Sequence, residues 1–174
     1  MIIRETSPDD AAAIVAIRRE VALEREYTLV EPEEMSTDEV AERRSIEGYA
    51  ASPGWLHLVA EVDGRIVGYI EFRNGGLRRI AHSGSFSIYL DSEHRGIGIG
   101  SMLLERLMEW ARANPIIEKV TLAVFSTNDR AQRLYRKFGF QEEGRCPRDM
   151  KLPTGKYVDS VLMYRFVDEK ESGS

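Results

Sequence analysis

Apolar residues recur along the chain at two different spacings, and these spacings predict where its helices and strands lie. A short segment that begins with two isoleucines, Ile2–Glu5, predicts a first strand. Apolar positions within Ile14–Val21 then recur at the helical period, so we expect a helix that begins at a hydroxyl cap near Ser7 and fades near Tyr27. A second helix is expected over Ser36–Tyr49, before a segment that contains Pro and Gly.

The middle of the chain alternates between apolar and polar residues. Trp55–Val62 alternates as a strand, Asp63-Gly64 is a favoured two-residue hairpin turn, and Arg65–Phe72 is the predicted return strand. After a glycine-containing connection, Ser83–Leu90 supplies the next strand. The pattern therefore predicts three consecutive antiparallel strands.

The helical period returns in the second half of the chain. Met102–Arg112 carries a broad apolar stripe with charged residues on the opposite side, which predicts an amphipathic helix. Lys119–Phe125 is rich in β-branched and apolar residues and predicts a strand. Asn128 is the expected N-cap of a shorter helix that Gly139 closes.

The chain ends in two predicted strands, Phe140–Gly144 and Tyr157–Val167, which we expect to pair as a hairpin, and in a polar tail, 168–174, expected to be disordered. Helices and strands alternate too little for a doubly wound parallel sheet. The predicted class is α+β, with about seven strands, about four helices and one mixed sheet. We expect a single domain over residues 1–167.

Composition and charge narrow the classes of protein that the chain can belong to. Its 174 residues, 43% of them apolar, suit one globular domain. The net charge of −5 argues against nucleic acid as the main partner, and no apolar run is long enough to span a membrane. The single cysteine excludes an internal disulfide and suits a reducing compartment, so we expect a cytoplasmic protein.

The histidines and the cysteine do not indicate a metal site. His57, His82 and His94 show no ligand spacing with one another or with Cys146. We interpret each histidine as a surface or hydrogen-bonding residue. Cys146 has no plausible histidine partner in the sequence, so we interpret it as incidental rather than as a nucleophile.

A glycine-rich loop joins the strand that ends at Leu90 to the helix that follows. Its sequence, His94–Ser101, places glycines at alternate positions and brings backbone N–H groups close to whatever lies before the helix. A helix N-terminus carries unpaired N–H groups and partial positive charge, which favours phosphate. A glycine-softened turn is the alternative. The loop is not a P-loop, because it lacks the lysine of that motif. It is not a dinucleotide-binding fingerprint either, because the next strand does not end in an acidic residue.

A second motif lies about thirty residues later: Asn128-x-x-Ala131-x-x-Leu134-Tyr135-x-Lys137-x-Gly139-Phe140. Together with the loop, it resembles the GNAT superfamily of N-acetyltransferases. Arg95, Gly98 and Gly100 match the family's Arg/Gln-x-x-Gly-x-Gly/Ala motif position by position. The resemblance implies a single GNAT-like domain whose fourth and fifth strands splay apart around the pantetheine arm of acetyl-CoA.

The resemblance also implies which residues bind the coenzyme. The loop would wrap its diphosphate, the strand that ends at Leu90 would hold the pantetheine arm with Asn128, and basic residues would meet its phosphates. The expected cofactor-binding residues are Ile88, Leu90, Arg95, Gly96, Ile97, Gly98, Ile99, Gly100, Ser101, Asn128, Arg130, Arg133 and Lys137. No metal is expected.

The implied reaction is direct attack of an amine on the acetyl thioester. We expect the Leu90 amide to stabilise the oxyanion and Tyr135 to protonate the departing thiolate, although helical spacing alone also allows Tyr135 to be a core residue. Glu71 is the candidate general base. Weaker candidates for the same role are Glu61, Asp159 and Tyr89.

The sequence defines the amine that accepts the acetyl group less closely than it defines the coenzyme site. The family implies that Tyr27–Tyr49 and Met150–Tyr164 form the acceptor site, and the acids in these segments suit a cationic amine. We expect a primary amine: a small amine, an amino acid or a protein N-terminus. The alternative is a non-catalytic acyl-CoA-binding regulatory module on the same fold. A homodimer is compatible with the sequence, which does not define the oligomeric state; neither nucleic acid nor a membrane is expected as a partner.

Overall fold

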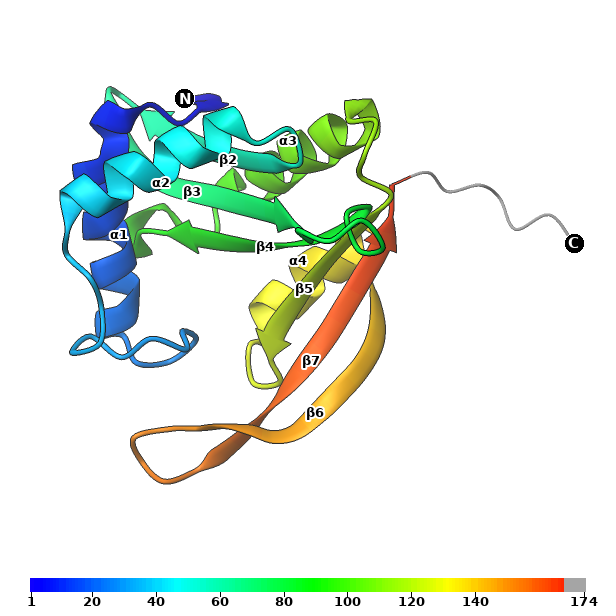
Figure 1. Ribbon diagram of the computed structural model, residues 1–174. Coiled ribbons are helices and arrows are strands. Elements are labelled where there is room, and N and C mark those ends of the chain that lie inside the picture. The colour runs from blue at the N-terminus through cyan, green and yellow to red at the C-terminus, as the bar shows by residue number, and fades with distance from the viewer. Residues whose placement is uncertain (168–174) are drawn as a thin grey trace, which may run out of the picture. The chain divides into compact units, whose positions relative to one another are not determined.

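A computed structural model describes residues 1–167 of the chain (Figure 1). The predicted tail, 168–174, lies outside the described residues. The strands are β1 (Ile2–Glu5), β2 (Trp55–Val62), β3 (Arg65–Asn74), β4 (Ser83–Leu90), β5 (Lys119–Phe125), β6 (Gln141–Lys151) and β7 (Tyr157–Phe166). The helices are α1 (Ala11–Leu23), α2 (Glu39–Ala51), α3 (Ile99–Ala113) and α4 (Asp129–Lys137), and two 3-10 turns are η1 (Pro8–Asp10) and η2 (Ser92–His94).

The strands form a mixed sheet in the order β1-β2-β3-β4-β5-β7-β6. Strands β4 and β5 run parallel, whereas β1 with β2, β5 with β7 and β6 with β7 are antiparallel. The predicted α+β class, with seven strands and four helices, is confirmed.

The parallel pairing of β4 and β5 is short. Its register joins Ser83–Ser85 to Lys119–Thr121, although β4 continues to Leu90 and β5 to Phe125. Two strands that pair only at their beginnings have the geometry of a splayed pair, so the predicted splay is confirmed.

The described residues form two compact units. The first contains Met1–Phe72 and Ser87–Leu107, and the second contains Arg73–Phe86 with the described residues from Met108 onward. The expectation of a single domain over 1–167 stays a prediction.

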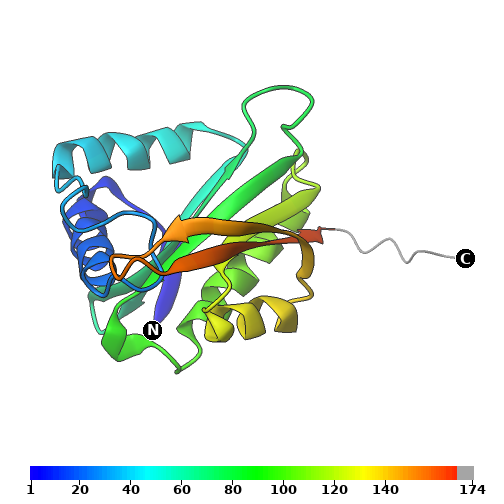
Figure 2. The same ribbon diagram turned by 90° about the horizontal axis from the view of Figure 1, so that it is seen from below.

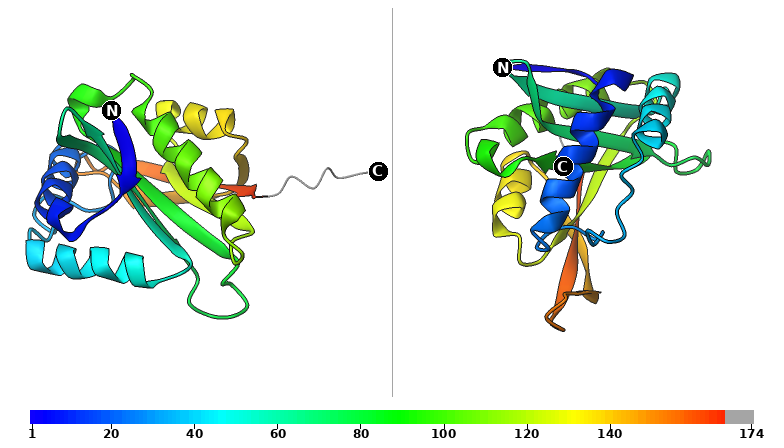
Figure 3. Two further views of the ribbon diagram at one scale, coloured as in Figure 1. Left: turned by 90° about the horizontal axis from the view of Figure 1, so that it is seen from above. Right: turned by 90° about the vertical axis from the view of Figure 1, so that its left-hand side faces the viewer.

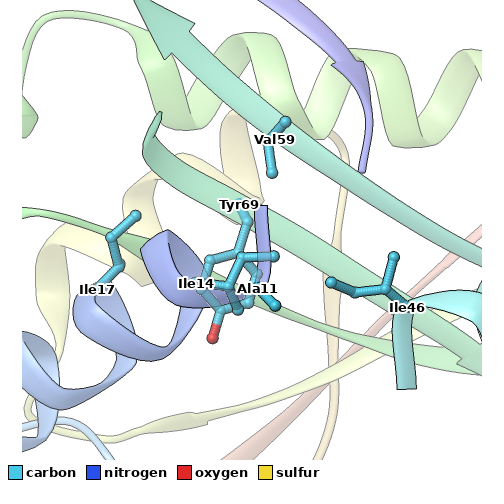
Figure 4. Close-up of a cluster of buried hydrophobic side chains, with 6 residues drawn as sticks. All are labelled: Ala11, Ile14, Ile17, Ile46, Val59 and Tyr69. Carbon is cyan, nitrogen blue, oxygen red and sulfur yellow. The ribbon is translucent and has the colours of Figure 1, made fainter. Parts of the chain in front are cut away.

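In the first unit, α1 and α2 lie on one face of β2 and β3, and the beginning of α3 lies on the other (Figures 2 and 3). Figure 4 shows how the helices bury their apolar faces against these strands. The side chains of this cluster are Ala11, Ile14, Ile17, Ile46, Val59 and Tyr69, all 5% exposed or less. Ile14 and Ile17 are spaced so that both lie on the face of α1 that packs against the sheet.

The second unit is built around β5, β7 and α4. Strands β6 and β7 form a long hairpin, seen in orange and red in Figure 1. The rings of Phe86, Tyr135 and Phe140 pack edge to face, with centroids 5.6 to 6.2 Å apart. This aromatic cluster fixes the α4 face that carries Tyr135.

Three helix boundaries differ from those predicted, each for a local reason. Helix α1 ends at Leu23, because Arg25 adopts a left-handed conformation with φ of 52° before Tyr27 is reached. Helix α2 begins at Glu39, where the Asp38 carboxylate caps two N–H groups, rather than at Ser36. Helix α3 begins at Ile99, three residues before Met102, because Ile99 is itself buried.

Strand β6 is longer than predicted. It runs to Lys151 rather than ending at Gly144, and its register against β7 shifts between Glu142 and Gly144 and between Cys146 and Met150. Such irregularities accommodate Pro147, which cannot donate a ladder hydrogen bond.

The turn before α1 contains a buried carboxylate. Asp10, 8% exposed, accepts hydrogen bonds from the Ser7 N–H at 2.8 Å and from both terminal nitrogens of Arg4, at 2.7 and 2.9 Å. The hydrogen bonds from Arg4 are the largest cause that lowers the pKa of Asp10. Asp10 therefore stabilises the fold above the carboxyl's unfolded pKa, and this contribution is lost as the pH falls through the lower folded value.

We expect Asp10→Asn to lower the free energy of unfolding by about 1–2 kcal/mol at pH 7, a modest value because Arg4 is 35% exposed. The difference from the unchanged protein should shrink as the pH is lowered below about 4, as urea denaturation at several pH values will measure. Asp9→Asn is the matched control, since Asp9 is 90% exposed in its pair with Arg43. Equal stability of the two variants at pH 7 would contradict the prediction.

Candidate active site

The glycine loop leads directly into α3. Gly96 and Gly98 have φ values of 83° and 96°, a conformation that L side chains rarely adopt. Because α3 begins at Ile99, Gly100 and Ser101 belong to its first turn rather than to the loop. The six consecutive N–H groups of Gly96–Ser101 donate to no acceptor within residues 1–167, and the first N–H group to be paired is that of Met102, which donates to the Gly98 carbonyl at 3.1 Å.

A buried carboxylate fixes the entry to this loop. Asp91, 1% exposed, accepts from the His94 backbone N–H at 2.9 Å and contacts His94 Nδ1 at 2.7 Å. Its own N–H donates to the Val67 carbonyl of β3 at 3.0 Å, and its second oxygen lies 3.7 Å from the Arg65 guanidinium. Asp91 thereby ties η2 to the sheet.

Arg95 makes contacts within its own unit. Its guanidinium donates to both carboxylate oxygens of Glu24 at 2.8 and 2.7 Å, and to the Leu90 carbonyl at 3.1 and 2.9 Å. The Glu24 contact is the largest cause that raises the pKa of Arg95. Just before the loop, Glu20 accepts from the N–H and the hydroxyl of Ser92, both at 2.9 Å. The end of α1 therefore holds both sides of η2, and the charge of Arg95 is already balanced.

The backbone of β4 presents its polar groups alternately to two edges. The Ser83 carbonyl and the Asp91 N–H both bond to the β3 side, whereas the His82 carbonyl accepts from Glu118 and Lys119 ahead of β5. Continuing this alternation, Ile88 and Leu90 direct their N–H groups away from β3. The register with β5 ends at Ser85, so within the described chain these groups have no partner strand. This is the edge where the oxyanion donor was predicted.

Glu71, the predicted base, lies on β3 and is partly buried. It accepts a hydrogen bond from the Tyr49 hydroxyl of α2 at 3.0 Å. In β3 and β4, Val67 bonds to Asp91 and Gly75 to Ser83, a register that sets Glu71 opposite Ser87. Of the alternative bases, Glu61 pairs with Arg4, and Asp159 accepts from the Arg148 N–H.

Helix α4 carries the second motif. Asn128 caps it as predicted, its side-chain oxygen accepting from the Ala131 N–H at 3.1 Å, and its amide nitrogen donates to no described residue. Arg130, Arg133 and Lys137 follow at helical spacing and are all exposed, with no ion pair inside the described chain. The helix ends at Lys137, and Gly139, just beyond the C-cap, has a φ of 79°.

Tyr135 lies on the buried face of α4 and is 6% exposed. Burial raises the pKa of its hydroxyl above the ordinary tyrosine value, so the group is protonated at neutral pH. The hydroxyl forms no hydrogen bond to a described residue, so its proton is not committed to another group of the protein.

Two kinds of site residue escaped sequence reasoning. Asp91 and Tyr49 were not predicted, although an Asp that directly follows a strand is a recognisable capping signal. His57 was predicted at the surface or in a hydrogen bond; it is buried, 5% exposed, with its ring 4.8 Å from that of Tyr49. Over residues 1–167, no group of three His, Cys, Asp or Glu residues is arranged to hold a metal ion, and no helix is long and apolar enough to cross a membrane.

Comparison with known proteins assigns the family. A family model described as the acetyltransferase (GNAT) family matches residues 20–140. The chain belongs to the GNAT family. Within this family it is 33% identical over 123 residues to the L-amino acid N-acetyltransferase AaaT of Escherichia coli K12, a match that covers 68% of this chain and 73% of AaaT.

Two further relatives match almost the whole chain. The L-amino acid N-acyltransferase MnaT of Escherichia coli K12 is 29% identical over 180 residues, covering 98% of this chain and 96% of MnaT. The crystal structure of a GNAT acetyltransferase from Streptococcus pneumoniae has a TM-score of 0.90 at 30% identity, covering 96% and 99% of the two chains. This GNAT member is accordingly an acetyl-CoA-dependent N-acetyltransferase with an amine acceptor.

The residues of the loop fit a coenzyme A diphosphate. Six unpaired N–H groups at a helix N-terminus are the donors that phosphate oxygens accept from. A Cβ built on Gly98 meets no atom of the protein within 4 Å, so the loop has open space on the side that a ligand would approach.

Proposed function

We propose that this GNAT enzyme acetylates the α-amino group of a free amino acid, by direct attack of the amine on acetyl-CoA. The run of unpaired N–H groups at Gly96–Ser101 is the observation that carries the donor half of the proposal. In this arrangement the diphosphate is held by backbone amides and the dipole of α3. Arg95 shapes the loop through Glu24 and Leu90, and the backbone edge at Ile88 and Leu90 receives the pantetheine arm.

Helix α4 supplies the remaining contacts to the coenzyme. Asn128 has an amide nitrogen to donate to the pantetheine arm. The exposed cations Arg130, Arg133 and Lys137 lie on a helix whose first turn is near Asn128, and we assign them to the phosphates.

Three groups carry out the chemistry. An alkyl ammonium has an ordinary pKa near ~10.4, so a base must remove a proton before the nitrogen can attack, and Glu71 takes this role. The Leu90 N–H donates to the oxyanion that forms on the acetyl carbonyl. Tyr135 gives its proton to the departing thiolate.

The relatives support the choice of acceptor. Both AaaT and MnaT are named for L-amino acids, and MnaT matches over nearly the whole chain. The acidic residues between α1 and α2 favour a positively charged amine. Glu31 and Glu33 pair with Arg25, which leaves Glu26 and Glu34 without a cation among the described residues.

We also propose that the enzyme works in the cytoplasm, as the single cysteine suggests, without nucleic acid or a membrane as a partner. The oligomeric state, for which the sequence is compatible with a homodimer, is to be measured by light scattering.

The proposal is tested by release of free thiol from acetyl-CoA with a panel of free L-amino acids, polyamines and ribosomal-protein N-terminal peptides. We expect turnover with one or more amino acids, and at least tenfold lower kcat/KM with the same residues as N-terminal peptides, since a pocket for a free amino acid also contacts its carboxylate. Preference for a peptide or a polyamine would correct the acceptor class. Coenzyme binding with no turnover on the whole panel would favour the acyl-CoA-binding module.

A further inference from the structure

The carboxylate of Glu71 receives one hydrogen bond from the described chain, and it comes from a different element. The Tyr49 hydroxyl, on the third turn of α2, lies 3.0 Å from Glu71 Oε2 on β3. Tyr49 is 5% exposed, so the contact is shielded from competing water. Glu71 Oε1 accepts no hydrogen bond from residues 1–167.

Aromatic packing holds the Tyr49 ring in place. The rings of Trp55 and His57 have centroids 5.4 and 4.8 Å from that of Tyr49. The packing continues from His57 to Tyr69 at 5.4 Å and from Tyr69 to Tyr89 at 4.9 Å. A ring fixed on two sides points its hydroxyl in one direction, and here that direction is toward Glu71.

The other charged and titratable groups around Glu71 do not replace this donor. Arg18 of α1 is already used by Glu42 of α2, at 2.8 and 3.2 Å, and by the Tyr69 hydroxyl at 3.1 Å. Burial, with a contribution from the charge of Glu71, raises the pKa of both Tyr69 and Tyr89, which are therefore neutral at pH 7.

Two further side chains complete these surroundings. Ser87 lies opposite Glu71 on β4, and Arg73 follows two residues later on the same face of β3.

We infer that Tyr49 is a positioning residue for the base: its hydroxyl fixes Glu71 Oε2 and leaves Oε1 directed to the acceptor. In the step that follows, Oε1 accepts one proton from the acceptor ammonium, which gives a neutral amine and a neutral carboxylic acid. The Tyr49 proton stays on its oxygen throughout. This inference rests on the proposed role of Glu71 as base.

A double-mutant cycle of Tyr49→Phe, Glu71→Gln and the combined variant tests the inference. We expect kcat/KM for the amine to fall about 100-fold in Glu71→Gln, the lower range for loss of a general base. Tyr49→Phe alone should lower it about tenfold, because a hydrogen bond to a charged group is lost while the ring packing remains. In the Glu71→Gln background, Tyr49→Phe should have no further effect.

The split between kinetic constants and a control variant separate positioning from a merely structural role. In Tyr49→Phe the loss should fall on kcat with the amine acceptor, because the oriented base acts in the chemical step. Tyr69→Phe is the matched control: it also removes the hydroxyl of a buried tyrosine, but one that accepts from Arg18 at 3.1 Å rather than donating to Glu71, so kcat should be unchanged. The thermal midpoints and the KM for acetyl-CoA should stay close to those of the unchanged enzyme.

The other possible results of these experiments contradict either the base assignment or the role of Tyr49. Normal activity in Glu71→Gln overturns the base assignment and with it the inference. A slow Glu71→Gln with a normal Tyr49→Phe overturns the role of Tyr49 alone. Additive losses in the combined variant would show that Tyr49 acts through a group other than Glu71.

Discussion

Tyr135→Phe is expected to lower kcat about 100-fold and to leave the protein folded, because a general acid contributes at least that factor. The substitution keeps the ring contacts with Phe86 and Phe140 and removes a hydroxyl that bonds to no described residue. The free energy of unfolding should therefore change by less than about 1 kcal/mol. Single-turnover release of the thiol measures the chemical step directly.

The size of this defect should depend on the leaving group. The coenzyme thiol has an ordinary pKa near that of cysteine, ~8.5, and its thiolate benefits from a proton. With an acetyl thioester of a more acidic thiol the departing group needs no acid, and Tyr135→Phe should then approach the activity of the unchanged enzyme. A defect of the same size with both donors would assign Tyr135 to packing or binding instead.

The pKa of Tyr135 also sets an expected pH dependence. Because burial raises it, the hydroxyl stays protonated through the pH range of the assay. The kcat profile should therefore show no alkaline loss from this group below the ordinary tyrosine pKa of about 10. An alkaline limb near neutrality that is absent from Tyr135→Phe would contradict the acid role as stated.

The local parts of the fold were predictable from the sequence, because local spacing determines them. Period-2 segments joined by Asp63-Gly64 give a hairpin whatever lies around it, and Asn128 and Gly139 bound a helix through their own backbone preferences. The start of α3 was placed too late because glycine disfavours helix. Ile99 lies four residues before Leu103, which is a helical spacing, and it is buried in the structure. This spacing should have outweighed the low helix propensity of glycine.

The contacts that organise the site were not predictable in the same way. Glu24 and Arg95 are 71 residues apart, and no pattern in either segment indicates that α1 ends beside the loop. The sequence motif therefore suggested that Arg95 binds a phosphate of the coenzyme, whereas the Arg95 side chain is paired within the protein. The contact from Tyr49 to Glu71 depends likewise on how α2 lies on the sheet. Local patterns identify the chemistry available, and tertiary packing decides which groups are already in use.

Gly98→Ala should weaken coenzyme A binding at least tenfold, a loss of about 1.4 kcal/mol, as isothermal titration calorimetry will measure. At a φ of 96°, an added methyl group strains the backbone and projects into the open space before α3, where it meets no protein atom within 4 Å. The methyl therefore obstructs the ligand rather than the fold. It also tilts the N–H groups that a diphosphate would accept from.

Gly64→Ala separates strain from binding. Gly64 in the turn between β2 and β3 has a φ of 79°, and a Cβ there also meets nothing within 4 Å, so both variants should lose a similar 1 kcal/mol or so of stability. Only Gly98→Ala should lose affinity for coenzyme A. It should also leave kcat/KM unchanged for acetyl-pantetheine, which carries the thioester but no diphosphate. Equal coenzyme affinity in the two variants would show that the diphosphate is bound elsewhere.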